Sequence, residues 1–132
     1  MLAIIDNMAK CPFCDSADRE ILAKSDRVYA VFDSHPVSRG HTLIIPRRHV
    51  SSVFKLADAE RSELWHLVNE VRSQLEREFH PNGFNIGVND GRAAGQTIEH
   101  AHIHVIPRYL GDVSDPRGGV RFVIPNRAKY WE

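Results

Sequence analysis

The sequence lacks a net charge and lacks any long apolar run. Its 132 residues include 17 Lys and Arg and 17 Asp and Glu. A chain balanced in this way has no basic surface with which to hold a nucleic-acid polymer or an anionic membrane. The apolar residues 1–5 are far too few for a signal-peptide core or a membrane span, and no later run approaches either length. We therefore expect a cytoplasmic protein that binds neither a nucleic-acid polymer nor a membrane.

Internal repeats and low-complexity segments are also absent, which argues against a repeat architecture or a disordered chain. The hydrophobic fraction of 42% is enough for one globular core. We expect residues 1–10 to be a flexible N-terminal extension. Residues 11–132 are expected to form a single domain that includes the C-terminal tail.

The chain has only two cysteines, Cys11 and Cys14, in a C-x-x-C spacing. In a cytosolic chain this spacing indicates a zinc half-site or a redox pair before a structural disulfide, and two small buried residues are the plainest alternative. No apolar strand precedes the pair, which weakens the redox interpretation. Zinc would need two further ligands, and the eight histidines, His49 among them, offer candidates.

The most reactive stretch is a row of three histidines. His100, His102 and His104 alternate with apolar residues, which is the period-2 pattern of a half-buried strand. Three imidazoles would then share one face, with neighbours roughly 6.5–7 Å apart. The turn at residues 90–95, which contains two glycines, should bring Asn89 and the backbone N–H groups of residues 95–97 close to this row.

Three interpretations of the histidine row remain open from the residues alone. The side chains could lie on a solvated face by accident. His102 and His104 could hold a catalytic zinc, although the sequence contains no H-E-x-x-H and no carboxylate cluster to complete such a site. A neutral imidazole could itself be the nucleophile, which suits phosphoryl or nucleotidyl transfer near neutral pH.

Hydrophobic periodicity predicts strands separated by one long helix. The spacing of apolar residues from Asp58 to Phe79 predicts that helix, and His80 to Gly83 should end it. We expect a short helix or turn between residues 15 and 25, and we expect Arg47 and Arg48 to be solvated charges at a strand end. The strands are expected at residues 27–33, 41–46, 84–89 and the histidine row, with a possible short strand at 120–124. This order indicates an antiparallel α+β fold.

The run from His100 to Ile106 resembles the H-φ-H-φ-H-φ-φ motif of the histidine triad (HIT) superfamily of nucleotide hydrolases and transferases, where φ is apolar. The resemblance spans about residues 11–108. Residues 94–97 before the motif and Pro107-Arg108 after it resemble the branch that hydrolyses diadenosine polyphosphates. The resemblance implies a HIT-like antiparallel five-stranded sheet with one main helix and a short N-terminal helix, and a homodimer with a ten-stranded sheet.

The resemblance also implies roles for individual residues. His102 would attack the α-phosphorus, His104 would donate a hydrogen bond to the phosphate, and the His100 carbonyl would accept one from the His102 ring. Asp33 would bind the ribose, and His41 would lie near the site. The positions expected to contact phosphate are Asn89, Gly95, Gln96 and Thr97.

The same resemblance implies a structural zinc bound by Cys11, Cys14, His49 and His100. The expected activity is hydrolysis of a small nucleotide through a covalent nucleotidyl-histidine, with a diadenosine polyphosphate as substrate and Gln96 and Arg108 as donors to its further phosphates. Asp33 is also compatible with an adenosine phosphoramidate. The alternative from another class is a nucleotide-binding, zinc-organised interaction module without turnover.

Overall fold

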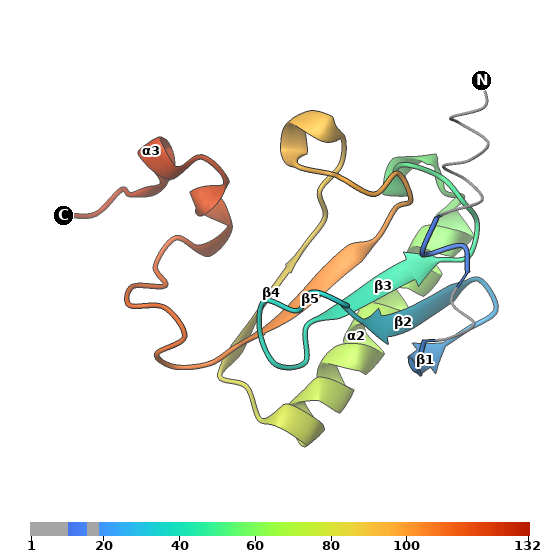
Figure 1. Cartoon of the computed structure of the whole chain (residues 1–132), viewed down its shortest axis with the longest axis horizontal. Helices are drawn as coiled ribbons and strands as arrows, with labels where there is room; N and C mark the ends of the chain where they lie inside the picture. Colours follow the sequence, from blue (N-terminus) through green and yellow to red (C-terminus); the bar gives the residue numbers. More distant parts are fainter. Residues whose placement is uncertain (1–10, 16–18) are drawn as a thin grey trace.

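The fold is one antiparallel five-stranded sheet with a long helix packed on one face (Figure 1). The computed structural model describes residues 11–15 and 19–132. The strands run in the order β1-β2-β3-β5-β4. Their bounds are β1 Ile21–Lys24, β2 Val28–Phe32, β3 Thr42–Pro46, β4 Gly83–Gly87 and β5 Ile103–Arg108. The expected fold class is therefore confirmed.

The long helix α2 spans Asp58–Phe79, as its apolar spacing predicts. Its buried face includes Leu64, Val71 and Leu75, which pack on the apolar side chains of the sheet. The helix ends at His80, whose φ of 51° is left-handed and is followed by a proline, so that the chain turns into β4. No helix among the described residues is long and apolar enough to cross a lipid bilayer.

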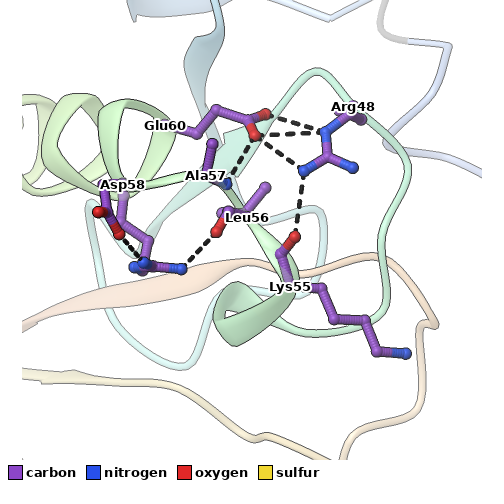
Figure 2. A network of polar contacts seen from close by, with 7 residues as sticks. Arg48, Lys55, Leu56, Ala57, Asp58 and Glu60 are labelled. Carbon is purple, nitrogen blue, oxygen red and sulfur yellow. Dashed lines mark hydrogen bonds and ion pairs between the residues drawn. The ribbon is translucent and has the colours of Figure 1, made fainter.

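An ion pair links the start of α2 to the segment after β3 (Figure 2). Arg48 Nη2 lies 2.8 Å from Glu60 Oε1 and also donates to the Lys55 carbonyl at 3.1 Å. The Glu60 carboxylate accepts in addition from the Ala57 N–H at 2.9 Å, which satisfies one of the free amides at the helix N-terminus. Arg48 is half exposed, as expected for a strand-end charge, but it has a partner.

Two expected elements differ from the structure. Ile21–Lys24, within the stretch expected to be a short helix or turn, is strand β1, which pairs antiparallel with β2. The described residues therefore contain no N-terminal helix. The segment expected to be a strand at 120–124 lies mostly in a 3-10 helix, Gly119–Val123, followed by the short helix α3, Pro125–Ala128. The tail leads away from the sheet to α3 (Figure 1).

The opposite face of the sheet, away from α2, is covered by the start of the described chain. Cys11 and Phe13 are buried there against Tyr29, Val31 and other side chains of β2 and β3. Tyr29 donates a hydrogen bond from its hydroxyl to the Phe13 carbonyl. This face also holds the histidine row, because Phe13 packs edge-on against both His100 and His102. The N-terminal extension expected at residues 1–10 lies outside the described part of the chain.

Candidate functional site

The histidine row lies partly outside the regular strand. Only His104 belongs to β5, where it is paired with Leu43 of β3 and Gly87 of β4. His100 and His102 lie in the segment just before it, where His100 is in a bend, and both are almost fully buried. Alternation still holds, since Ile103 and Val105 pack in the core with the side chains of α2. The three rings therefore extend along one face, as the period-2 pattern predicts.

The hydrogen bond of the His102 ring fixes which of its nitrogens can react. His102 Nδ1 lies 2.8 Å from the carbonyl oxygen of His100. A carbonyl can only accept, so Nδ1 carries the proton and Nε2 of the neutral ring keeps its lone pair. The ring also lines a cavity of about 410 Å³. His102 thus has the tautomer that a nucleophilic imidazole requires.

His104 is oriented by a second chain of hydrogen bonds. The Val37 N–H donates to His41 Nδ1 at 3.1 Å, so the proton of a neutral His41 ring is on Nε2. His41 Nε2 lies 2.9 Å from His104 Nδ1 and 3.4 Å from Asp33 Oδ2. His104 Nδ1 therefore accepts, and its Nε2–H is left as a donor. His104 itself lines the cavity.

Burial favours the uncharged form of the His104 and His41 rings. The pKa of His104 is lowered to about 4, first by burial and then by the neighbouring His102 and His41. Burial also lowers the pKa of His41, although the Asp33 carboxylate opposes the shift. Asp33, His41 and His104 are close enough to hold a metal ion. The Val37 N–H, however, places the His41 proton on the nitrogen that a metal would need, so this cluster is suited to hydrogen bonding.

Seven predicted site residues line the same cavity. They come from three separate parts of the chain and are Asp33, Asn89, Gly95, Gln96, Thr97, His102 and His104. His41 is buried and does not line the cavity, but it contacts two residues that do, His104 and Asp33. The structure thus brings together the residues that the sequence placed at one site.

Two of the backbone N–H groups expected to face an anion are hydrogen-bonded within the glycine turn itself. Gly91 and Gly95 have φ of 96° and 92°, which residues other than glycine rarely adopt. The Gly95 N–H donates to the Arg92 carbonyl at 3.0 Å and the Gln96 N–H to the Gly91 carbonyl at 3.2 Å. Within the described residues, the Thr97 N–H has no such acceptor. Of the three amides expected to face an anion, only that of Thr97 is free.

The two side chains expected to reach further phosphates have other partners. Gln96 Nε2 donates to the carbonyls of Ser51 and Ile98, at 2.8 and 3.0 Å, and its Oε1 accepts from the Gly91 N–H. Arg108 forms a two-pronged ion pair with Asp112 and is not among the cavity residues. In this conformation both side chains therefore have protein partners, and their expected role as donors to a phosphate chain stays a prediction.

Sequence reasoning missed several cavity residues, and Arg19 is the one among them with a permanent charge. It donates from Nη2 to the Phe32 carbonyl, next to Asp33, and lines the cavity. A single arginine in a polar stretch gives no signal by itself, and β1, which follows it, was not predicted. Only the pairing of β1 with β2 brings Arg19 to the site.

The two cysteines lie close to His49 and His100, and none of the four lines the cavity. Their four ligand atoms all lie within 4.8 Å of one another. Cys11 Sγ is 3.4 Å from His100 Nδ1, Cys14 Sγ is 3.1 Å from His49 Nδ1, and the two Nδ1 atoms are 3.1 Å apart. Ligands on a tetrahedral zinc would be separated by about 3.4–3.8 Å. The donor set and its spacing fit a zinc ion.

The ring of His100 is oriented for such a role. His100 Nε2 lies 2.7 Å from the Pro46 carbonyl, so it carries the proton and Nδ1 presents its lone pair to the thiols. Burial and the neighbouring Cys11 raise the pKa of the Cys14 thiol to about 11. A cation between the ligands would oppose that shift.

An antiparallel sheet with one long helix and a cavity lined by two oriented imidazoles defines the class of this protein. The HIT domain model matches residues 15–111, and the chain belongs to the HIT domain family. A crystal structure of a HIT family protein from Bacillus anthracis superposes with a TM-score of 0.73 at 36% identity, over 78% of this chain and 76% of that one.

Named relatives include nucleotide-processing enzymes. The chain is 35% identical over 103 residues to "Protein hit" of Bacillus subtilis, covering 75% of this chain and 71% of that protein. It is 37% identical to "AP-4-A phosphorylase" of Mycobacterium tuberculosis, over 71% of this chain but only 49% of that protein. It is 38% identical to "Bis(5'-adenosyl)-triphosphatase" of Dictyostelium discoideum, over 67% of this chain and 60% of that protein.

Proposed function

We propose that the chain is a nucleotide hydrolase that attacks an α-phosphate through His102 and forms a covalent nucleotidyl-histidine. The observation that carries the proposal is the 2.8 Å contact between His102 Nδ1 and the His100 carbonyl, which leaves Nε2 as the reactive atom. The names of the relatives support a nucleotide substrate, and a diadenosine polyphosphate is the substrate that we propose.

The reaction would proceed in two displacements. His102 Nε2 forms a bond to the α-phosphorus while the bond from phosphorus to the leaving-group oxygen breaks, and the leaving group departs with the electron pair of that bond. The Nε2–H of His104 donates to the phosphate oxygens as charge develops on them. Water then attacks phosphorus and the bond to Nε2 breaks, which releases the nucleoside monophosphate and a proton.

Asp33 would hold the ribose hydroxyls at one end of the cavity. Its Oδ1 already accepts from the His35 N–H at 2.8 Å, which orients the carboxylate. Asn89 and the free Thr97 N–H would donate to phosphate oxygens. His41 acts through His104 and is a positioning residue in this scheme.

Incubation with diadenosine tetraphosphate tests the proposal directly. AMP should appear as one product, and protein denatured at alkaline pH, where the phosphorus–nitrogen bond survives, should carry an adenylyl group on His102 by mass spectrometry. His102→Ala should lose the adduct, and its turnover should fall by several orders of magnitude with unchanged circular dichroism. His66→Ala is the matched control, because His66 is exposed on α2. Binding of the dinucleotide without turnover in the wild type would instead indicate a nucleotide-binding module.

Adenosine phosphoramidate is the comparison substrate. Asp33 is compatible with that class as well as with the dinucleotides, and no residue of the cavity visibly reads the base. A kcat/KM for the phosphoramidate well above that for diadenosine tetraphosphate would reassign the substrate and leave the role of His102 intact.

We also propose that Cys11, Cys14, His49 and His100 bind one structural zinc ion. Four protein ligands would fill a tetrahedral site and leave no open position for a substrate. The ion would tie residues 11–14 to the segments after β3 and before β5. Since Pro12 and Phe13 line the cavity, its contribution to function would be to hold that wall in place.

The third proposal is a two-fold homodimer formed through the β4 edge of the sheet. β4 is an outer strand, so its far side presents unpaired backbone groups. Near the end of β4, Phe54 and Trp65 are 74% and 53% exposed and flank an apolar groove that includes Leu64 and Val88. A second copy would cover both features.

A further inference from the structure

The cavity wall contains one permanent cation. Among the residues that line it in the described part of the chain, Arg19 is the only arginine or lysine. Its Nη2 donates to the carbonyl of Phe32, which anchors the guanidinium at the end of β2. A guanidinium carries five N–H donors in a planar fork and stays charged at every accessible pH. One donor is used by Phe32, so others remain for a ligand.

The rest of the wall offers little positive charge to an anion. Burial lowers the pKa of His104, so its ring is neutral. Asp33 adds a negative charge and is the only carboxylate among the described residues of the wall. Without Arg19, a substrate with several phosphates would meet the Asp33 charge with no fixed charge to offset it.

The other candidates for binding a phosphate chain are occupied. Arg108 is held by Asp112 at 2.7 Å and lies outside the cavity wall. The Gln96 amide is bound to two backbone carbonyls. Arg19 is therefore the remaining side chain that could match both the charge and the fork geometry of a phosphate.

We propose that Arg19 is a specificity-determining residue that binds the phosphate chain of the leaving group and selects nucleotides with such a chain over those with an uncharged leaving group. This inference rests on the nucleotidyl transfer proposed for His102. It assigns the substrate preference to a residue outside the histidine motif.

A comparison of two substrates with the same nucleotidyl group tests Arg19. The leaving group of diadenosine tetraphosphate is a polyanion, whereas the leaving group of adenosine phosphoramidate is uncharged ammonia. In Arg19→Gln, kcat/KM for the tetraphosphate should fall about ten- to hundredfold, mainly through KM, as expected for a lost charge-assisted hydrogen bond. The value for the phosphoramidate should change less than about threefold.

Arg77→Gln is the matched control. Arg77 is exposed near the end of α2, so the substitution changes the net charge equally but lies away from the cavity. Both of its kcat/KM values should match the wild type. Arg19→Lys keeps the charge without the fork and should recover part of the activity on the tetraphosphate. An equal fall on both substrates, or no fall on either, would overturn the assignment.

Direct binding separates this inference from the proposed reaction. Isothermal titration with inorganic tripolyphosphate should show weaker binding to Arg19→Gln than to the wild type, and the difference should shrink at high salt. This measurement needs no turnover. Equal affinity in the two proteins would reject the role of Arg19 even if His102 proves to be the nucleophile, and a loss of affinity would support it even if no substrate is hydrolysed.

Discussion

His41 Nε2 and His104 Nδ1 lie 2.9 Å apart, and the direction of their hydrogen bond is set by a backbone amide. Because Val37 N–H occupies the other nitrogen of His41, the proton between the two rings belongs to His41. The Val37 amide thus determines, through His41, which nitrogen of His104 can donate into the cavity.

Replacing His41 should therefore impair catalysis without removing a group that touches substrate. In His41→Ala we expect kcat to fall about ten- to hundredfold with a smaller change in KM, because His104 is no longer held in one tautomer. His41→Gln can still donate from its Nε2 and should recover part of kcat. Steady-state kinetics on diadenosine tetraphosphate check this, and wild-type kcat in the alanine variant would contradict the relay.

The protein should lose stability as the pH falls from about 6.5 towards about 4. His104 has a folded pKa of about 4 because it is buried near other histidines, whereas the unfolded value is about 6.5. Between these values the unfolded chain binds more protons, so its free energy falls relative to the folded state. His41 contributes in the same direction. Urea unfolding at several pH values measures the slope.

A His104→Gln variant provides the control for that pH effect. It cannot be protonated in this range, so its free energy of unfolding should depend less on pH than that of the wild type. Identical slopes for the two proteins would show that His104 is not responsible.

One zinc ion per chain should copurify with the protein and stabilise it. Removal with a chelator should lower the melting temperature, since metal binding is linked to folding. Elemental analysis and thermal unfolding with and without chelator measure both effects. Cys11→Ser/Cys14→Ser should contain no zinc and should melt like the stripped wild type; a variant that keeps its full zinc content would refute the ligand set.

A dimer should be visible by light scattering at micromolar concentration. Trp65→Glu places a charge at the exposed apolar groove and should shift the protein towards monomer. Glu76→Gln, on an exposed position of the same helix, is the control and should leave the mass unchanged. A monomeric wild type would rule out the assembly.

The ion pair between Arg48 and Glu60 should contribute modestly to stability. Hydrogen bonding from Arg48 lowers the pKa of Glu60, which makes the pair favourable above acidic pH. Glu60→Gln should lower the melting temperature by a few degrees in low salt and by less in high salt. Arg72 and Glu76, an ion pair on α2 whose carboxylate is more exposed than that of Glu60, give the comparison, and Glu76→Gln should have the smaller effect.

The parts of the fold that sequence reasoning located are those with strong periodicity. Asp58–Phe79 has apolar residues at helical spacing over its whole length, and the helix has these bounds. Ile21–Lys24 has only a short apolar pair in a polar context, so its strand depends on pairing with β2, which no local pattern reveals. Residues 120–124 are apolar except for Arg121, but they follow two glycines with positive φ and pair with no strand in the described structure.

For the site, the motif located the residues but not their partners. The positions of His102, His104 and Asp33 followed from the motif and its resemblance. That Gln96 binds Ser51 and Ile98 depends on how the turn folds over a distant segment, which sequence spacing does not encode. Arg19 belongs to the same category, because only the tertiary structure brings it to the cavity.

The hydrogen bond to the His102 ring comes from a main-chain atom of residue 100, and this has a consequence for mutational tolerance. Any amino acid at that position still has a carbonyl, so side-chain replacement alone does not delete the acceptor that sets the reactive nitrogen. The imidazole of His100 therefore has no role in the proposed reaction, and its Nδ1 faces the cysteines. Replacing the side chain of His100 should accordingly weaken metal binding more than it slows the proposed reaction.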